Sequence, residues 1–141
     1  MYTVKEAAEL LEMSEHTIRY YTDCQLIPTL IRDKNNQRLF NQESMNWLIG
    51  IKRLKECGMS IKDIKHYVAL SLQGDSTIDE RYQIFLHLKD IAYDQLEETQ
   101  NRVQFLENKV KHYEEIVSKK IPDDTNPNKW NKLEKEKPEL K

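Results

Sequence analysis

Hydrophobic and polar positions near the N-terminus alternate with the period of a helix. Apolar residues recur at the i, i+3, i+4 and i+7 spacing of one helix face, at Val4, Ala7, Ala8 and Leu11. Thr3 and Glu6 form a capping box at the start of this run. The pattern predicts a short helix over residues 4–11, and its two alanines allow another helix to approach closely.

A second helical segment is predicted within residues 14–28. Ser14 is a good N-cap, because its hydroxyl can accept a hydrogen bond from a backbone N–H of the first turn. At about 100° per residue, Ile18 and Tyr21 fall together on one face of this helix. The opposite face presents polar groups, namely His16, Arg19 and Tyr20. The pattern predicts one face that packs and one that offers hydrogen-bond donors.

The two segments are separated by only Glu12 and Met13. Two helices joined so tightly are typical of a helix-turn-helix. A purely structural helical hairpin is the alternative, but it does not need Arg19 and Tyr20 side by side on the surface. The residues Leu26, Ile27 and Pro28 are expected to end the second helical region, because proline disfavours helical geometry in the residue before it.

A small β-hairpin is predicted next. Residues 29–32 and 38–40 are compatible with strands, and the intervening residues 33–37 include two asparagines, which tolerate positive φ. A hairpin directly after a helix-turn-helix is typical of a wing. Its basic residues Arg32, Lys34 and Arg38 would lie along a phosphate backbone. The alternative is an ordinary solvated loop.

Two further helices are predicted, and they are expected to supply most of the core. Asn41 caps the third helix and Gly58 ends it, whereas Ser60 and Asp63 form a capping box for a fourth helix that ends near Leu72. Their apolar stripes are Trp47, Leu48, Ile51 and Leu54, then Ile61, Ile64 and Val68. The basic cluster of residues 52, 53 and 55 is either a solvated face or a second contact with the DNA backbone, and the sequence alone favours the solvated face.

One long helix is predicted over residues 76–118, with Ser76 and Asp79 at its start. Apolar positions alternate by three and four residues for three heptads: Leu96, Thr99, Val103, Leu106, Val110, Tyr113 and Val117. A helix of this size is roughly 60 Å long, too long to bury the seam against so small a domain. The sequence therefore predicts a dimerising coiled coil in preference to a helix packed within one chain.

The predicted organisation is a DNA-binding domain over residues 1–72, a dimerisation helix over residues 76–118 and a charged tail over residues 119–141. The composition of the tail is typical of a flexible segment. Trp130 could anchor it on a partner subunit or contribute to a ligand pocket, although a lone aromatic residue is weak support for either role.

Composition narrows the function without identifying it. Of the 141 residues, 38% are hydrophobic and 33% charged, and no apolar run approaches the roughly 18 residues of a membrane span. The N-terminus has no pattern of a secretion signal, so a cytoplasmic protein with no membrane partner is expected. The net charge of −2 divides into +1 up to Leu70 and −3 beyond it. A DNA-binding function must therefore depend on where basic residues lie, not on their number.

The sequence does not favour an enzyme. Its three glycines provide no phosphate-binding loop, and its histidines, at positions 16, 66, 87 and 112, stand apart from one another. No catalytic residue, metal site or cofactor is predicted. Two cysteines, Cys24 and Cys57, are too few for a disulfide framework. His66 and Tyr67 either border an effector pocket or form a partly exposed structural pair, and the second interpretation is favoured.

Several motifs together resemble the mercury-resistance-regulator (MerR) family of bacterial transcription factors. The most specific is Thr17 to Tyr21 (TIRYY), continued by Leu26 to Pro28 (LIP), and the hairpin, the CGMS turn and the terminal heptads complete the match over residues 2–118. The resemblance implies a mainly α fold. Winged helix-turn-helix domains with a β-hairpin wing would be joined through long helices into an antiparallel coiled-coil homodimer.

The same resemblance implies a function. Family members bind a pseudo-palindromic promoter and bend and untwist it, which realigns its elements for RNA polymerase. A cytoplasmic, nucleoid-associated bacterial regulator of stress genes is therefore expected. Matching positions place Arg19 and Tyr20 of the recognition helix, Arg38 of the first wing and Lys55 of the second on DNA. The expected DNA-binding set is Ser14, His16, Thr17, Arg19, Tyr20, Arg38 and Lys55.

Two departures from the family pattern bear on the signal. Asn36 and Gln37 replace the usual Gly-Tyr of the wing, so a tyrosine contact is lost. No cysteine follows Cys57, which excludes the thiolate sites of members that sense mercury, copper or zinc. Small members without metal ligands respond to reactive aldehydes and other electrophiles, some through a cysteine at the position of Arg53. Cys57 lies one turn later and is a candidate sensor, although a buried structural cysteine is favoured.

Two other functions share part of this pattern. An architectural or excisionase-like DNA-binding module has the winged helix but lacks a long dimerisation helix. A coiled-coil scaffold that binds only proteins has the helix but no affinity for DNA. The sequence does not specify the operator, the effector or the sign of regulation.

Overall fold

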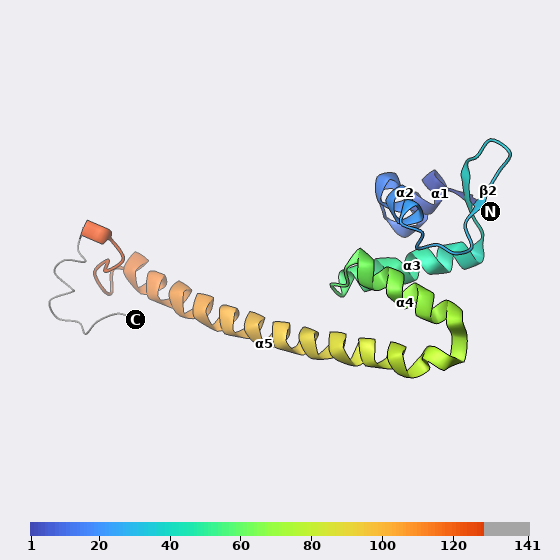
Figure 1. The fold of residues 1–141 in the computed structure, drawn as a ribbon. Helices are drawn as coiled ribbons and strands as arrows, with labels where there is room; N and C mark the ends of the chain where they lie inside the picture. The colour runs from blue at the N-terminus through green and yellow to red at the C-terminus, as the bar shows by residue number, and fades with distance from the viewer. Residues whose placement is uncertain (129–141) are drawn as a thin grey trace. The chain divides into compact units, whose positions relative to one another are not determined.

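The fold is mainly helical with a long C-terminal helix, as the sequence predicts, and its small sheet has three strands (Figure 1). The computed structural model describes residues 1–128, so Trp130 lies outside the described residues. The elements in chain order are β1 (Tyr2–Thr3), α1 (Val4–Leu11), α2 (Glu15–Asp23), β2 (Ile31–Arg32), β3 (Arg38–Phe40), α3 (Gln42–Glu56), α4 (Ile61–Gln73), the 3₁₀ helix η1 (Gly74–Thr77) and α5 (Ile78–Val117). They divide into two compact units, Met1–Ala92 and Tyr93–Lys141.

Local capping sets the starts of the first four helices. The predicted capping box of α1 is present, because Thr3 N donates to Glu6 Oε1 at 3.0 Å and Glu6 N donates to Thr3 Oγ1 at 3.2 Å. Hydrogen bonding of the Glu6 carboxylate, first to the Thr3 backbone N–H and then to the Thr3 side chain, lowers the pKa of Glu6. The side chains of Ser14, Asn41 and Ser60 likewise accept a backbone N–H at the starts of α2, α3 and α4.

The wing hairpin is confirmed, and the sequence missed its third strand. The strand order is β1-β3-β2 with antiparallel pairing, so the N-terminal residues Tyr2 and Thr3 pair with Phe40 and Leu39. In the turn, the Asp33 carboxylate accepts from Asn35 N and Gln37 N, at 2.8 and 2.9 Å. Asn36 adopts φ 61°, the positive φ that the asparagines were predicted to tolerate.

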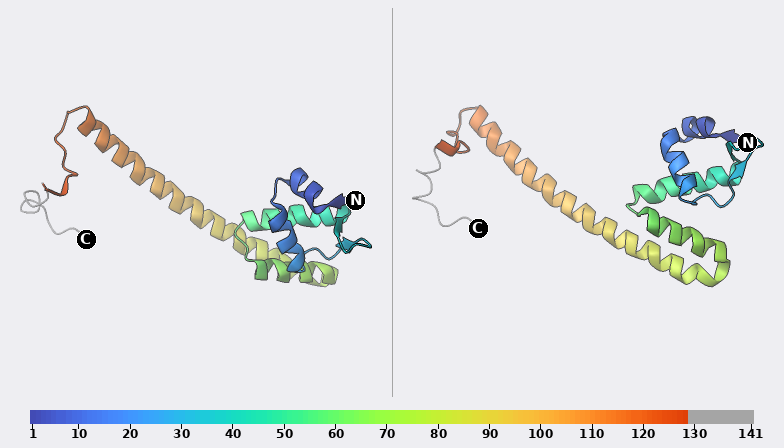
Figure 2. Two further views of the ribbon diagram at one scale, coloured as in Figure 1. Left: turned by 90° about the horizontal axis from the view of Figure 1, so that it is seen from above. Right: turned by 45° about the horizontal axis from the view of Figure 1, so that its top comes forward.

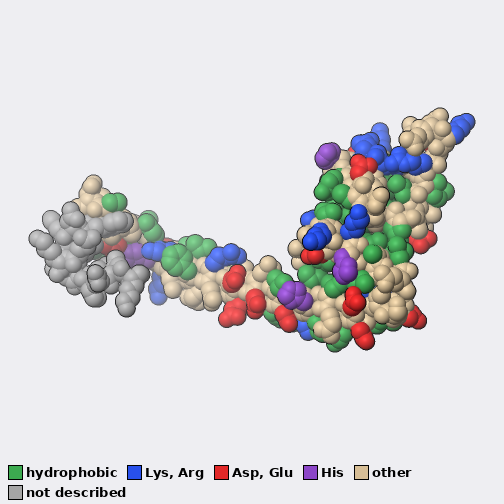
Figure 3. Space-filling view, in the orientation of Figure 1, with side chains coloured by type: hydrophobic (Ala, Val, Ile, Leu, Met, Phe, Trp, Pro, Cys, Tyr) green, Lys and Arg blue, Asp and Glu red, His purple; other side chains and the backbone are tan. Residues whose placement is uncertain are grey.

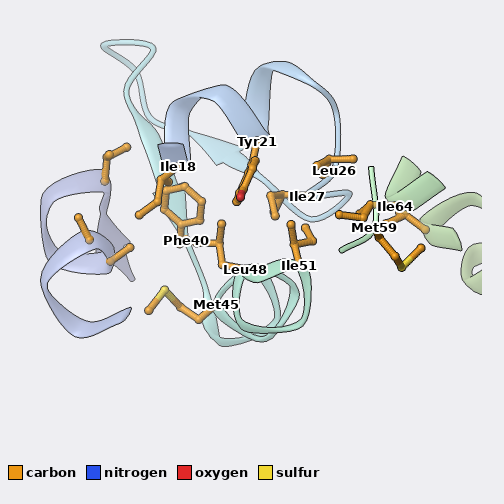
Figure 4. Packing of buried hydrophobic residues seen from close by; sticks show 14 residues of the cluster. Ile18, Tyr21, Leu26, Ile27, Phe40, Met45, Leu48, Ile51, Met59 and Ile64 are labelled. Atoms are coloured by element: carbon orange, nitrogen blue, oxygen red, sulfur yellow. The ribbon is translucent and has the colours of Figure 1, made fainter. Parts of the chain in front are cut away.

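The core lies in the first unit, where α3 is seen between the α1–α2 pair and α4 (Figure 1 and Figure 2). Figure 4 shows Ile18 of α2 beside Phe40 of β3, with Leu48 and Ile51 of α3 facing them. The prediction that α3 and α4 supply most of the core is wrong, because the first forty residues contribute eight buried apolar side chains and these two helices contribute six. The eight are Val4, Ala7, Ala8, Ile18, Tyr21, Leu26, Ile27 and Phe40.

The helix α2 ends at Asp23, well before the proline that was expected to end its region. Cys24 is its C-cap and Gln25 adopts φ 62°, a left-handed conformation that stops the helix. The chain then folds back so that Leu26 N donates to Tyr21 O at 3.1 Å. Leu26 and Ile27 therefore enter the core from a loop.

The predicted N-cap of the long helix at Ser76 is wrong. Ser76 lies inside η1, and α5 begins at Ile78. The buried Thr77 hydroxyl lies within hydrogen-bonding distance of two carbonyl oxygens, Leu70 O at 2.6 Å and Gly74 O at 2.9 Å. Arg81 adds a bond from its Nη2 to Gly74 O at 3.0 Å. This turn satisfies carbonyls at the end of α4 with side chains that the sequence pattern did not single out.

Among the described residues, no helix is long and apolar enough to cross a membrane.

Candidate nucleic-acid interface

The helix α2 has the two faces that its sequence predicts. Ile18 and Tyr21 are buried, whereas His16, Arg19 and Tyr20 are exposed. The Ser14 hydroxyl accepts Thr17 N at 3.0 Å and donates to Thr17 Oγ1 at 2.7 Å, which fixes the first turn. The exposed face therefore presents an imidazole, a guanidinium and a phenol from a helix anchored by its opposite side.

Arg19 and Tyr20 have partners on their own helix. Arg19 Nη2 lies 3.1 Å from Glu15 Oε1 in a half-exposed ion pair one turn long. Interaction with the Cys24 thiol, also one turn away, raises the pKa of Tyr20 above its ordinary value. A tyrosine is protonated at neutral pH with or without this shift, so the exposed Tyr20 hydroxyl is a hydrogen-bond donor.

The wing arginine Arg38 is linked to α2. Its Nη2 donates to Asp23 Oδ1 at 2.8 Å, and its Nε is buried without a hydrogen-bond partner among the described residues. Arg32 donates instead to Asn36 O of the same turn, at 3.0 Å. Lys34 is exposed in the turn. The sequence pattern singled out the three basic residues of the wing but not the role of Asp23.

A groove of about 350 Å³ brings part of the expected DNA-binding set together. It is lined by Thr3, Val4, Lys5, Glu15, Arg19, Asn36, Gln37 and Arg38. Lys5 was not a predicted site residue; its exposed position in the first turn of a capped helix is the signal that points to it. Figure 3 shows Lys and Arg side chains gathered along the edge of the first unit that carries the wing.

The basic cluster on α3 is divided between two roles, so its interpretation as one solvated face is wrong for Lys52. Lys52 Nζ donates to Leu11 O at 2.8 Å and is half-buried. Arg53 and Lys55 are exposed near the end of α3, and neither lines the groove. Lys55 is therefore free to meet a ligand, while Lys52 joins two helices.

The cysteines differ from expectation. Cys57 is exposed at the C-cap of α3, so the expectation of a buried structural cysteine is wrong. The helix ends there because Gly58 adopts φ 91°, after which Met59 returns to the core. Cys24 is half-buried against the core.

All seven residues of the predicted heptad seam on α5 are exposed: Leu96, Thr99, Val103, Leu106, Val110, Tyr113 and Val117. The same three-four spacing extends back to Ile78, Tyr82 and Phe85, which are also exposed and which the sequence analysis left out. Another face of the helix carries Ile84 and Leu88 onto the core of the first unit. An exposed apolar stripe thus follows α5, interrupted at Lys89 and partly covered at Phe85 by Tyr67.

The other titratable side chains form no cluster. Among residues 1–128, no group of three His, Cys, Asp or Glu side chains is placed to hold a metal ion. His66 is exposed, whereas Tyr67 packs edge-on against Phe85 with ring centroids 5.3 Å apart. Tyr67 also lines a groove of about 260 Å³ between α3 and α4. Of His66 and Tyr67, only Tyr67 therefore packs against other parts of the described structure.

Comparison with known proteins agrees with this geometry. Residues 2–70 match the sequence profile of the MerR HTH family regulatory proteins. An uncharacterized HTH-type transcriptional regulator of Haemophilus influenzae is 34% identical over 113 residues, which cover 80% of this chain and 84% of the relative.

Solved structures show the same fold. HiNmlR, a MerR family regulator lacking the sensor domain and crystallised bound to promoter DNA, has a TM-score of 0.75 at 33% identity; the match covers 83% of this chain and 89% of HiNmlR. A MerR family transcriptional regulator from Bacillus thuringiensis has a TM-score of 0.69 at 30% identity, covering 79% of this chain and 98% of that one.

Proposed function

The chain belongs to the MerR family of transcriptional regulators, and we propose that it binds a pseudo-palindromic promoter site as a homodimer and distorts that site. The observation that carries this proposal is the exposed donor face of α2, held beside the wing arginine at one groove. A helix supported from behind and exposed on its polar side has the form required to enter a major groove.

The proposed contacts divide by chemistry. Arg19 and Tyr20 would meet the major groove, and His16 lies on the same exposed face. Ser14 and Thr17 at the start of the helix offer hydroxyls to the sugar-phosphate backbone. Arg38 and Lys55 would bind phosphates on either side of the helix, where cations fix the register of the protein on the duplex.

Dimerisation is proposed through the apolar stripe of α5. In an antiparallel pair, positions whose numbers sum to 195 would face each other along the whole helix. Ile78 would meet Val117 of the second copy at the ends, and Leu96 would meet Thr99 at the centre. The exposure of both halves of the stripe supports this register, because the apolar positions of each half then face apolar positions of the other, with the exception of Leu106, which faces Lys89.

The proposed dimer binds two DNA half-sites at one fixed spacing, and the proposed distortion of the promoter depends on that spacing. A protein that contacts DNA through a helix and flanking cations can stabilise a bent or untwisted duplex, a deformation that costs several kcal/mol. Such a deformation would realign the two promoter elements so that RNA polymerase can bind both. The exposed thiol of Cys57 is proposed as the point at which an electrophile acts. We propose a regulatory and not an enzymatic role.

The test is Arg19→Ala in the full chain, measured against a promoter site recovered by binding-site selection. The proposal expects loss of specific binding with the dimer intact, since removing one good bidentate base contact costs about 1–3 kcal/mol in each half-site. Lys65→Ala, an exposed substitution on α4, is the control for general loss of charge. Unchanged affinity of Arg19→Ala for the selected site contradicts the proposed recognition.

A further inference from the structure

Asp23 joins the recognition helix to the wing. It is the last residue of α2, and its Oδ1 accepts a hydrogen bond from Arg38 Nη2 at 2.8 Å. Of the ion pairs between described residues, this one alone connects α2 with another element; the Arg19–Glu15 pair lies within α2. The contact spans fifteen residues of sequence and fixes two elements that are both proposed to contact DNA.

The geometry of β3 explains why Arg38 reaches α2. Side chains two apart on a strand share a face, so Arg38 lies on the face of Phe40, which is fully buried against Ile18 (Figure 4). The Arg38 side chain is only 20% exposed, whereas that of Asp23 is 62% exposed. Asp23 therefore approaches a largely enclosed guanidinium from the solvent side.

The positive charge of Arg38 requires a nearby negative charge, because another arginine lies opposite it on the sheet. Its cross-strand neighbour is Arg32, and like charges directly opposite each other on a sheet repel. Arg32 turns to Asn36 O, which leaves Asp23 as the charge that balances Arg38. A carboxylate at a helix C-terminus is itself unfavourable with the helix dipole, and α2 has no basic residue in its last turn. Asp23 thus occupies a position that helix preference alone disfavours.

We propose that Asp23 is a positioning residue, which holds Arg38 at a fixed place relative to the recognition helix so that both meet DNA in one register. The proposal rests on the proposed function. The carboxylate of Asp23 has two opposite effects on DNA binding. It repels phosphates and so weakens non-specific binding, and it orders Arg38 and so strengthens specific binding. Together these effects raise the ratio of specific to non-specific affinity.

The experiment compares Asp23→Asn with Glu15→Gln in the full chain. Both substitutions remove one negative charge from α2, but Glu15 pairs within its own helix and Asp23 pairs with the wing. In the absence of DNA, the NMR order parameter of the Arg38 Nε–H bond is expected to fall in Asp23→Asn and to stay at the wild-type value in Glu15→Gln. An equally ordered Arg38 in Asp23→Asn overturns the proposal.

The second arm measures affinity for a selected site and for an unrelated duplex at one salt concentration. The ratio of the two affinities is expected to fall about threefold to fivefold in Asp23→Asn, the order of one solvent-accessible ion pair, and to stay unchanged in Glu9→Gln, which removes one negative charge from an exposed side chain of α1 outside the groove. Equal changes of the ratio in both variants overturn the positioning role. A wild-type protein that prefers no sequence contradicts the proposed function instead, and the order parameter of Arg38 then decides whether Asp23 holds the wing.

Discussion

Lys52 Nζ donates a hydrogen bond to the carbonyl oxygen of Leu11 at 2.8 Å, across forty-one residues of sequence. Leu11 is the last residue of α1, where carbonyls have no partner within the helix. The Lys52 side chain of α3 therefore satisfies a backbone carbonyl at the C-terminus of α1. Lys52, from the basic cluster that the sequence alone indicates as a solvated face, thus has a structural role.

Lys52→Met is expected to lower the free energy of unfolding by about 1–3 kcal/mol, because it removes a charge-assisted bond and leaves the Leu11 carbonyl unsatisfied. Urea unfolding followed by circular dichroism measures the change. Lys55→Met is the control: Lys55 is exposed without a side-chain partner in the described structure, and its substitution should stay within about 0.5 kcal/mol. Equal effects of the two variants contradict the structural role of Lys52.

The turn between α4 and α5 depends on Thr77 rather than on Ser76. Thr77→Val keeps the shape of the buried side chain but removes its bonds with Leu70 O and Gly74 O, so a loss of about 1–3 kcal/mol in unfolding free energy is expected. Ser76→Ala removes an exposed hydroxyl outside any cap and should be nearly neutral. A larger loss in Ser76→Ala would restore the cap that the sequence predicts.

Dimerisation through the seam can be tested with two α5 residues of similar exposure. Val110 lies on the seam and is 56% exposed, whereas Phe105 lies off it and is 59% exposed. Val110→Asp places a charge against Phe85 of the second copy in the proposed dimer and is expected to yield monomers in sedimentation equilibrium at micromolar concentration. Phe105→Asp is expected to remain dimeric. A wild-type monomer, or two variants that behave alike, contradicts the proposed seam.

The two thiols should differ in reactivity. Cys57 is exposed and Cys24 is half-buried, so diamide or methylglyoxal is expected to modify Cys57 first. Mass spectrometry of peptides after brief exposure measures the order. For the proposed sensor role, Cys57→Ser is expected to lose the response of the promoter to the same reagents, and an unchanged response removes that role.

Local chemistry made much of the fold predictable. Capping residues and helical spacing lie within a few positions of one another, so α1 is predicted to the residue and the donor face of α2 is predicted with its buried face. The family was likewise predictable, because TIRYY and LIP are each a continuous run of residues and lie close together in the sequence. The roles of the DNA-binding and dimerisation residues stay predictions.

The features that the sequence missed depend on contacts between distant residues. The strand β1 is two residues long and exists because β3 pairs with it. The helix α2 ends because Gln25 adopts a left-handed conformation. Glycine is the usual sequence signal for that conformation, and this position has none. The Asp23–Arg38 and Lys52–Leu11 contacts join residues 15 and 41 positions apart, which no local period can report.

The most direct test of the proposed function is binding-site selection from random duplex DNA with the full chain, followed by measurement of the mass of the protein–DNA complex. We predict enrichment of an inverted repeat with one fixed spacing between half-sites, bound by two copies of the chain. Insertion of half a helical turn between the half-sites should abolish tight binding, because it rotates one site away from its α2. Enrichment of no sequence, or of a single half-site bound by one copy, would contradict the account.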